Sequence, residues 1–137
     1  MLDLSGMNPP QRQAVVTTEG PLLVLAGAGS GKTRVIVHRI AWLLEKGVPA
    51  SAILAMTFTN KAASEMKERV AMLVSQRRAR DLTVSTFHAF GLQVLRAEHG
   101  RLGYPRQFTI ADAGDQNALV KRAMREVRID DRSFDPK

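Results

Sequence analysis

The residues best suited to chemistry stand together in the run Ala26-Gly27-Ala28-Gly29-Ser30-Gly31-Lys32-Thr33. Glycines let a backbone turn its N–H groups inward around a phosphate, where side chains would clash. Lys32 can then reach the β- and γ-phosphate oxygens, and the Thr33 hydroxyl can join the shell of a magnesium ion. The run therefore predicts a phosphate-binding loop that takes ATP with Mg²⁺. Lys32 and Thr33 are its catalytic candidates.

The first position of this loop departs from the usual pattern, which has glycine where this chain has Ala26. That position begins the turn and does not touch phosphate, so we still expect the loop to form. The alternative is a glycine-rich turn between a strand and a helix that binds nothing. The context favours the loop, because an apolar strand is predicted before it and the helix after it aims its positive end at a bound anion.

The elements that must position the loop follow an alternation of short apolar runs and amphipathic helices, which is typical of a parallel α/β sheet. Strands are expected at residues 22–26, 53–57 and 82–86, the first of them buried on both faces. A further helix is expected to begin at Asp112 as its N-cap, after a connector from about Gly100 to Phe108. The apolar stripes of the four helices are Ile36, Ile40, Leu43 and Leu44; Ala62, Met66, Val70 and Leu73; Phe87, Phe90 and Val94; and Leu119, Val120, Ala123, Met124 and Val127.

Composition narrows the class of protein. The 137 residues are 45% apolar and 24% charged, as in a folded globular domain. Lys and Arg number 20 against 13 Asp and Glu, and this basic balance favours a polyanionic partner over the alternative of a merely solvated surface. The absence of cysteine excludes disulfides, thiolate zinc sites and cysteine nucleophiles. No leader-like start and no apolar run of roughly 20 residues is seen, so we expect a cytoplasmic protein without a membrane segment.

Three further segments accompany the loop: MNPPQRQAV at residues 7–15, TFTNKAA at residues 57–63 and TFH at residues 86–88. With the loop, in this order and spacing, they resemble the N-terminal motifs of the UvrD/Rep-like superfamily 1A ATP-dependent DNA helicases. The resemblance implies a P-loop NTPase (RecA-like) fold of the α/β class, a parallel sheet with flanking helices that is incomplete in this chain. It divides the chain into 1–99, the N-terminal part of the first RecA-like ATP-binding domain, and 100–137, the beginning of an inserted helical subdomain.

The resemblance also assigns an ATP site. Gln11 would pair with adenine through its amide, and Arg34 would lie near the base. Each has an alternative, because Asn8, Pro9 and Gln11 also form a capping-box-like helix start and Arg34 could be a solvated helix residue. Both roles of Gln11 hold only if its side chain is free to turn outward. The implied ATP-binding residues are Gln11, Ala26, Gly27, Ala28, Gly29, Ser30, Gly31, Lys32, Thr33 and Arg34, with Thr33 also on Mg²⁺.

Single-stranded or partly duplex DNA is the partner that the resemblance implies. Phe58 would offer its ring to a base while Asn60 and Lys61 hold phosphates, and Thr86 and His88 would donate to the DNA backbone. The alternatives are a core phenylalanine beside a Thr-Asn helix cap at residues 58–60, and a structural role for His88. The implied DNA-binding residues are Thr57, Phe58, Thr59, Asn60, Lys61, Thr86, Phe87 and His88, with the ring of Phe87 packed beneath.

One motif of the resembling helicases is missing: a strand ending in Asp-Glu that holds magnesium and activates water. No Asp-Glu pair occurs in this sequence, and the nearest, Asp130-Asp131, follows a helix. The arginine fingers would lie further on than Phe134-Asp135-Pro136-Lys137. We therefore expect the ATP-binding and DNA-contacting N-terminal portion of a helicase or translocase, 3′-to-5′ by resemblance, in DNA repair or replication, that alone neither hydrolyses ATP nor unwinds DNA.

Two other functions remain open from the sequence: a truncated module that binds ATP or single-stranded DNA without motor activity, and an unrelated phosphate-loop enzyme such as a small-molecule kinase. The missing acidic strand has a structural consequence as well. In the resembling proteins it lies beside the strand that carries the phosphate loop, so its loss leaves open sheet edges. We expect the chain to self-associate or to be poorly soluble.

Overall fold

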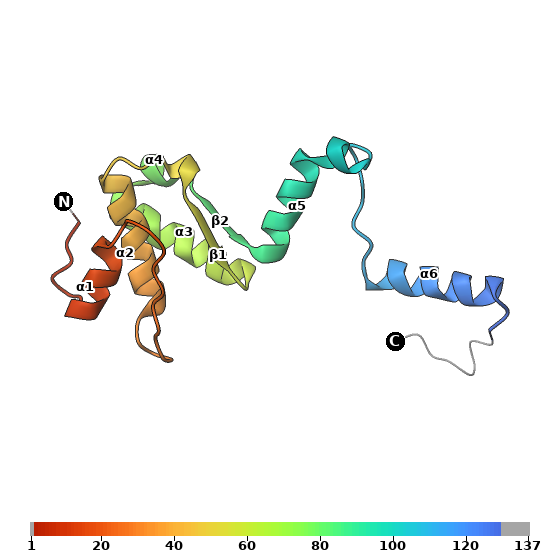
Figure 1. The fold of residues 1–137 in the computed structure, drawn as a ribbon, viewed down its shortest axis with the longest axis horizontal. Coiled ribbons are helices and arrows are strands. Elements are labelled where there is room, and N and C mark those ends of the chain that lie inside the picture. Colours follow the sequence, from red (N-terminus) through yellow and green to blue (C-terminus); the bar gives the residue numbers. More distant parts are fainter. Residues whose placement is uncertain (1, 130–137) are drawn as a thin grey trace. The chain divides into compact units, whose positions relative to one another are not determined.

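The computed structural model describes residues 2–129 of the chain (Figure 1). Asp130-Asp131 and Phe134–Lys137, discussed above, lie outside the described residues. The chain divides into two units, Met1–Val94 and Leu95–Lys137, and each is described here by itself. Within the described residues, no helix is long and apolar enough to cross a membrane.

The first unit opens with two helices that pack against each other, α1 (Pro9–Val16) and α2 (Lys32–Glu45). The start of α1 is the capping box that the sequence predicts: Asn8 accepts from the Gln11 N–H, and the Gln11 side chain accepts from the Asn8 N–H. Arg39 of α2 ties the other end of α1, because its guanidinium donates to the carbonyls of Ala14, at 2.7 Å, and Thr17. The position of α1 is thus set by α2, the helix that follows the predicted phosphate loop.

Two parallel strands follow, β1 (Leu54–Thr57) and β2 (Thr83–Thr86), after the short 3₁₀ helix η1 (Ala50–Ala52). They pair in a register that sets Leu54 opposite Thr83 and Thr57 opposite Thr86. The crossover between them contains α3 (Asn60–Val74) and the short α4 (Gln76–Ala79). Because the strands are parallel, both carboxyl ends lie at one edge of the sheet, and α3 and α5 (Phe87–Ala97) begin directly beyond it (Figure 1).

The core of this unit is formed mainly by α2, α3 and the two strands. Val70 is fully buried in it, with Ile40, Leu44 and Met66 close to fully buried. A smaller cluster, in which Val15 is fully buried, joins α1 to α2. The apolar stripes predicted for α2 and α3 are therefore confirmed in part, since Ile36 of α2 and Leu73 of α3 remain exposed.

The predicted strand at residues 22–26 is wrong. This segment has no regular structure, and every residue from 21 to 30 is exposed, with Leu23 at 82% and Leu25 at 87%. A parallel strand is held by hydrogen bonds to its neighbours, and the sheet in the described part of the chain contains β1 and β2 but no strand that pairs with this segment. The segment therefore leads to the phosphate loop as an extended, solvent-facing chain.

The second unit contains the end of α5 (Phe87–Ala97), the short 3₁₀ helix η2 (His99–Leu102) and α6 (Ala113–Glu126). Asp112 caps α6 as predicted, accepting from the Asp115 N–H at 2.8 Å. The prediction of a buried stripe on this helix is wrong, because α6 has no buried residue, and neither has α5. An amphipathic pattern is buried only where a second element covers it, and the described part of this unit packs no helix or sheet closely on α6.

Candidate nucleotide and DNA site

The predicted phosphate loop meets the start of α2 through two glycines in the left-handed region. Gly29 has φ +74° and Gly31 has φ +83°, a conformation that residues with a Cβ rarely adopt. Gly31 is the N-cap of α2 and provides no side-chain hydrogen bond to the helix. The first N–H groups of α2 therefore have no side-chain cap from this residue. They are suited to an anion, as the positive end of a helix is.

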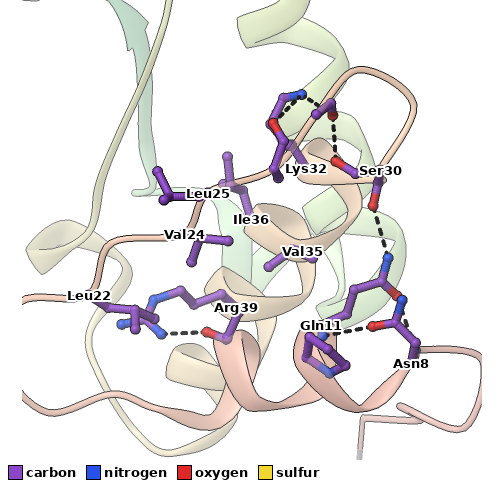
Figure 2. Close-up of a pocket in the computed structure, with 14 residues that line it drawn as sticks. Asn8, Gln11, Leu22, Val24, Leu25, Ser30, Lys32, Val35, Ile36 and Arg39 are labelled. Carbon is purple, nitrogen blue, oxygen red and sulfur yellow. Dashed lines mark hydrogen bonds between the residues drawn. The ribbon is translucent and has the colours of Figure 1, made fainter.

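The Lys32 side chain folds back over the loop that precedes it. Its ammonium donates to the Gly27 carbonyl at 2.7 Å and to the Ala26 carbonyl at 3.3 Å. The Ser30 hydroxyl donates to the same Gly27 carbonyl at 2.7 Å, so these contacts close the loop on itself (Figure 2). Lys32 is exposed, and its charge thus stands at the mouth of the loop, where the γ-phosphate of a nucleotide is expected.

Gln11 lies at the opposite side of the loop, where both ends of its amide are engaged. Its Oε1 accepts from the Asn8 N–H at 3.1 Å, and its Nε2 donates to the Ser30 carbonyl at 3.0 Å. Figure 2 shows the side chain lying between α1 and the loop. The capping box and a contact to the loop therefore exist together, and the side chain does not turn outward into solvent.

A pocket of about 550 Å³ opens between α1, the segment that leads to the loop and α2. Its volume is in the range of small-ligand sites. Figure 2 shows Val24 and Leu25 of the extended segment beside Ile36 of α2, with Lys32 and Ser30 at the loop end. The pocket is also lined by residues of α1 and α2 that were not among the predicted site residues: Pro10, Ala14, Val35, Ile36 and Arg39. Arg39 could have been found, because it interrupts the apolar stripe between Ile36 and Ile40 with a charge.

The last two predicted ATP-site residues lie on the first turn of α2. Thr33 is exposed, so its hydroxyl is accessible to a metal ion. No group of three or more His, Cys, Asp or Glu that could hold a metal occurs among the described residues. Arg34 is exposed as well, and its guanidinium lies against Gly6, where a Cβ would stand 2.7 Å from Nη2.

The two predicted DNA-contacting phenylalanines meet at the carboxyl edge of the sheet. Phe58, directly after β1, is 88% exposed, and Phe87, at the start of α5, is 51% exposed. Their ring centroids are 5.6 Å apart with a tilt of 42° between the planes. The alternative of a core phenylalanine at position 58 is therefore wrong. The Phe87 ring lies beside that of Phe58 as a partly exposed neighbour, and the two form an aromatic surface.

Two of the three predicted threonines around this surface serve as helix caps. The Thr59 hydroxyl accepts from the Ala62 N–H at 3.1 Å at the start of α3, and the Thr86 hydroxyl accepts from the Ala89 N–H at 3.2 Å at the start of α5. Thr86 is buried, and Thr57 is half-buried and only partly open to solvent. Besides Phe87, three other predicted residues are exposed in the first turns of the two helices: Asn60, Lys61 and His88.

The chain is similar to known proteins over nearly its whole length. The family model of the UvrD/REP helicase N-terminal domain matches residues 7–137. The chain is 52% identical over 134 residues to the ATP-dependent DNA helicase PcrA of Leuconostoc citreum, and over 135 residues to those of Bacillus subtilis and Staphylococcus aureus. These matches cover 97 to 98% of the chain, which spans about 18% of the length of each relative. The chain belongs to the UvrD/REP helicase N-terminal domain family.

Proposed function

We propose that this chain is the ATP-binding and single-stranded-DNA-contacting N-terminal portion of an ATP-dependent DNA helicase or translocase. The observation that carries the proposal is the pairing of two surfaces on one small unit. A phosphate loop stands at the N-terminus of α2, and an exposed aromatic pair stands at the N-termini of α3 and α5. A motor on nucleic acid needs both surfaces.

The nucleotide side is supported by the glycine conformations of the loop, the ammonium of Lys32 at its mouth and the uncapped start of α2. ATP would lie with its phosphates in the loop and its base toward Gln11 and Arg34. A Mg²⁺ ion on the Thr33 hydroxyl and the phosphate oxygens would neutralise charge on the β- and γ-phosphates. Lys32 would exchange its contacts with the loop carbonyls for contacts with phosphate.

The DNA side is supported by the exposure of the aromatic pair and by the cations beside it. A base can stack on the ring of Phe58, and Lys61 and the N–H groups at the starts of α3 and α5 can hold the flanking phosphates. The basic balance of the whole chain, a formal net charge of +7, favours the same partner. These contacts read the shape and charge of a single strand rather than its sequence.

The same proposal includes what the chain lacks. Phosphoryl transfer to water requires a group that activates the water and cations that stabilise the transition state. The sequence contains no Asp-Glu pair for the first role. The chain alone would thus bind ATP without hydrolysing it. Unwinding, with 3′-to-5′ polarity and in repair or replication, would belong to a longer protein.

The experiment measures binding of a fluorescent ATP analogue and of single-stranded DNA to the chain, with an ATPase assay alongside. Lys32→Ala is expected to weaken nucleotide binding and leave DNA binding intact, while Phe58→Ala does the reverse. Hydrolysis is expected to be absent. Turnover at enzymatic rates without DNA would overturn the proposal and favour a small-molecule kinase. The reading frame distinguishes a portion of a helicase from a binding module without motor activity. In a helicase it would continue into a strand ending in Asp-Glu.

A further inference from the structure

Gln11 is joined to the phosphate loop by a contact that spans 19 positions of sequence. Its Nε2 donates to the Ser30 carbonyl at 3.0 Å, and its Oε1 is held at the same time by the Asn8 N–H at 3.1 Å. The contact is close on the loop side, because a Cβ on Gly31 would stand 3.2 Å from the same Nε2. The Gln11 amide is therefore held through both its oxygen and its nitrogen, between the start of α1 and the loop (Figure 2).

The contact fixes the orientation of one peptide unit. A peptide is planar and trans, so the Gly31 N–H points to the side opposite the Ser30 carbonyl, away from Gln11. Glycines flank Ser30 on both sides, at 29 and 31, and give this peptide more freedom to rotate than other residues would. Within the described part of the chain, the Gly31 N–H donates to no other protein group. Its direction is thus set through the carbonyl of the same peptide.

We infer that Gln11 is a positioning residue of the phosphate loop, which directs the Gly31 N–H at a bound phosphate whatever base the nucleotide carries. The inference rests on the proposed binding of ATP. It is compatible with adenine recognition by the same residue without the outward turn expected from the sequence, because an amide has two N–H groups and two lone pairs on its oxygen. One of each is used here, and one of each remains for a base.

The test is to compare three magnesium-loaded ligands by calorimetry: ATP, inosine triphosphate and inorganic tripolyphosphate, which has no base. Gln11→Met keeps the length of the side chain and removes both hydrogen bonds. We expect it to weaken binding of all three ligands by about twofold to tenfold, because of its two hydrogen bonds only the one to Ser30 orients the loop and one hydrogen bond contributes about this much. Gln13→Met places the same substitution at an exposed position elsewhere on the same helix and is expected to leave tripolyphosphate binding unchanged.

The outcomes distinguish positioning of the phosphate loop by Gln11 from recognition of adenine by Gln11. If Gln11→Met weakens ATP alone, the residue reads adenine and the inference is wrong. If the unaltered chain binds none of the three ligands, and Lys32→Ala changes nothing, the proposed function itself fails as well. Should circular dichroism show that Gln11→Met disturbs the fold, Gln11→Glu keeps the acceptor for the Asn8 N–H and loses the donor to Ser30. Its effect is then measured against Gln13→Glu, which adds the same charge to α1, and equal tripolyphosphate binding by these two variants would contradict the inference.

Discussion

Exposure separates the side chains at the carboxyl edge of the sheet that are open to a ligand from those that cap helices. Phe58 is almost wholly solvent-facing, whereas the hydroxyls of Thr59 and Thr86 are used by the N–H groups of helices. The resemblance assigned all three to DNA, and the sequence offered a Thr-Asn helix cap at residues 58–60 as the alternative. The motif alone could not show which of these side chains the fold uses for its own hydrogen bonds. A substitution at Phe58 therefore reports on binding, and one at Thr59 reports mainly on stability.

Phe58→Ala is expected to weaken single-stranded DNA binding by about 1–3 kcal/mol, the contribution of one base stacked on an aromatic ring. The melting temperature should hardly change, because little of the side chain is buried. Fluorescence anisotropy with a labelled oligonucleotide measures the first quantity and a thermal melt the second. The matched control is Met72→Ala, another exposed apolar residue, on α3. Equal DNA affinity in Phe58→Ala and the unaltered chain would remove the aromatic pair from the proposed DNA surface.

Helices and strands with a local pattern were predictable, and those that depend on distant partners were not. The capping box at Asn8, the N-cap at Asp112 and the strands that became β1 and β2 follow from signals within a few residues. The segment at 22–26 and the stripe of α6 failed for one shared reason. An apolar pattern predicts which residues would be buried if another element packed on them. It does not show whether such an element is present. The tie between Gln11 and Ser30 was likewise invisible, because it joins positions far apart in sequence.

The cap of α3 gives a prediction at the scale of one element. Thr59→Ala removes the acceptor for the Ala62 N–H and is expected to lower the free energy of unfolding by about 1 kcal/mol. Thr59→Ser retains a hydroxyl and should recover most of this loss. Urea unfolding followed by circular dichroism measures both variants. Thr59 also lies in the proposed DNA surface, so DNA affinity is measured at a temperature where every variant is folded. Equal stability of the alanine and serine variants would mean that the cap contributes little.

A second prediction at this scale concerns the packing of α3 on the core. Met66 is 4% exposed in the main cluster, so Met66→Ala leaves a cavity and is expected to lower the free energy of unfolding by about 2–5 kcal/mol. Met72→Ala, the same change on the exposed face of α3, should have an effect within about 0.5 kcal/mol. The comparison by urea unfolding tests whether this helix is packed as the structure has it. Similar losses at the two positions would contradict the packing.

For the whole molecule, the extended segment at residues 22–26 is the feature with the largest consequence. It presents apolar side chains and backbone groups unpaired in the described sheet, next to the predicted phosphate loop. Such a segment is a template for pairing with another chain, since strand addition would satisfy its hydrogen bonds and bury its leucines together. We therefore expect that, if the chain self-associates as predicted, it does so through residues 22–26.

Charges placed on this segment should prevent the association. Leu23→Lys with Leu25→Lys is expected to leave a monomer at concentrations where the unaltered chain forms dimers or larger species, because lysine opposes pairing of edge strands. Sedimentation velocity across a concentration series measures the change. A control with two lysines elsewhere, Met72→Lys with Leu102→Lys, adds the same charge at exposed apolar positions and should still associate. A stable monomer of the unaltered chain at every concentration would show that the segment is tolerated in solvent, whereas equal rescue by both pairs would attribute association to net charge.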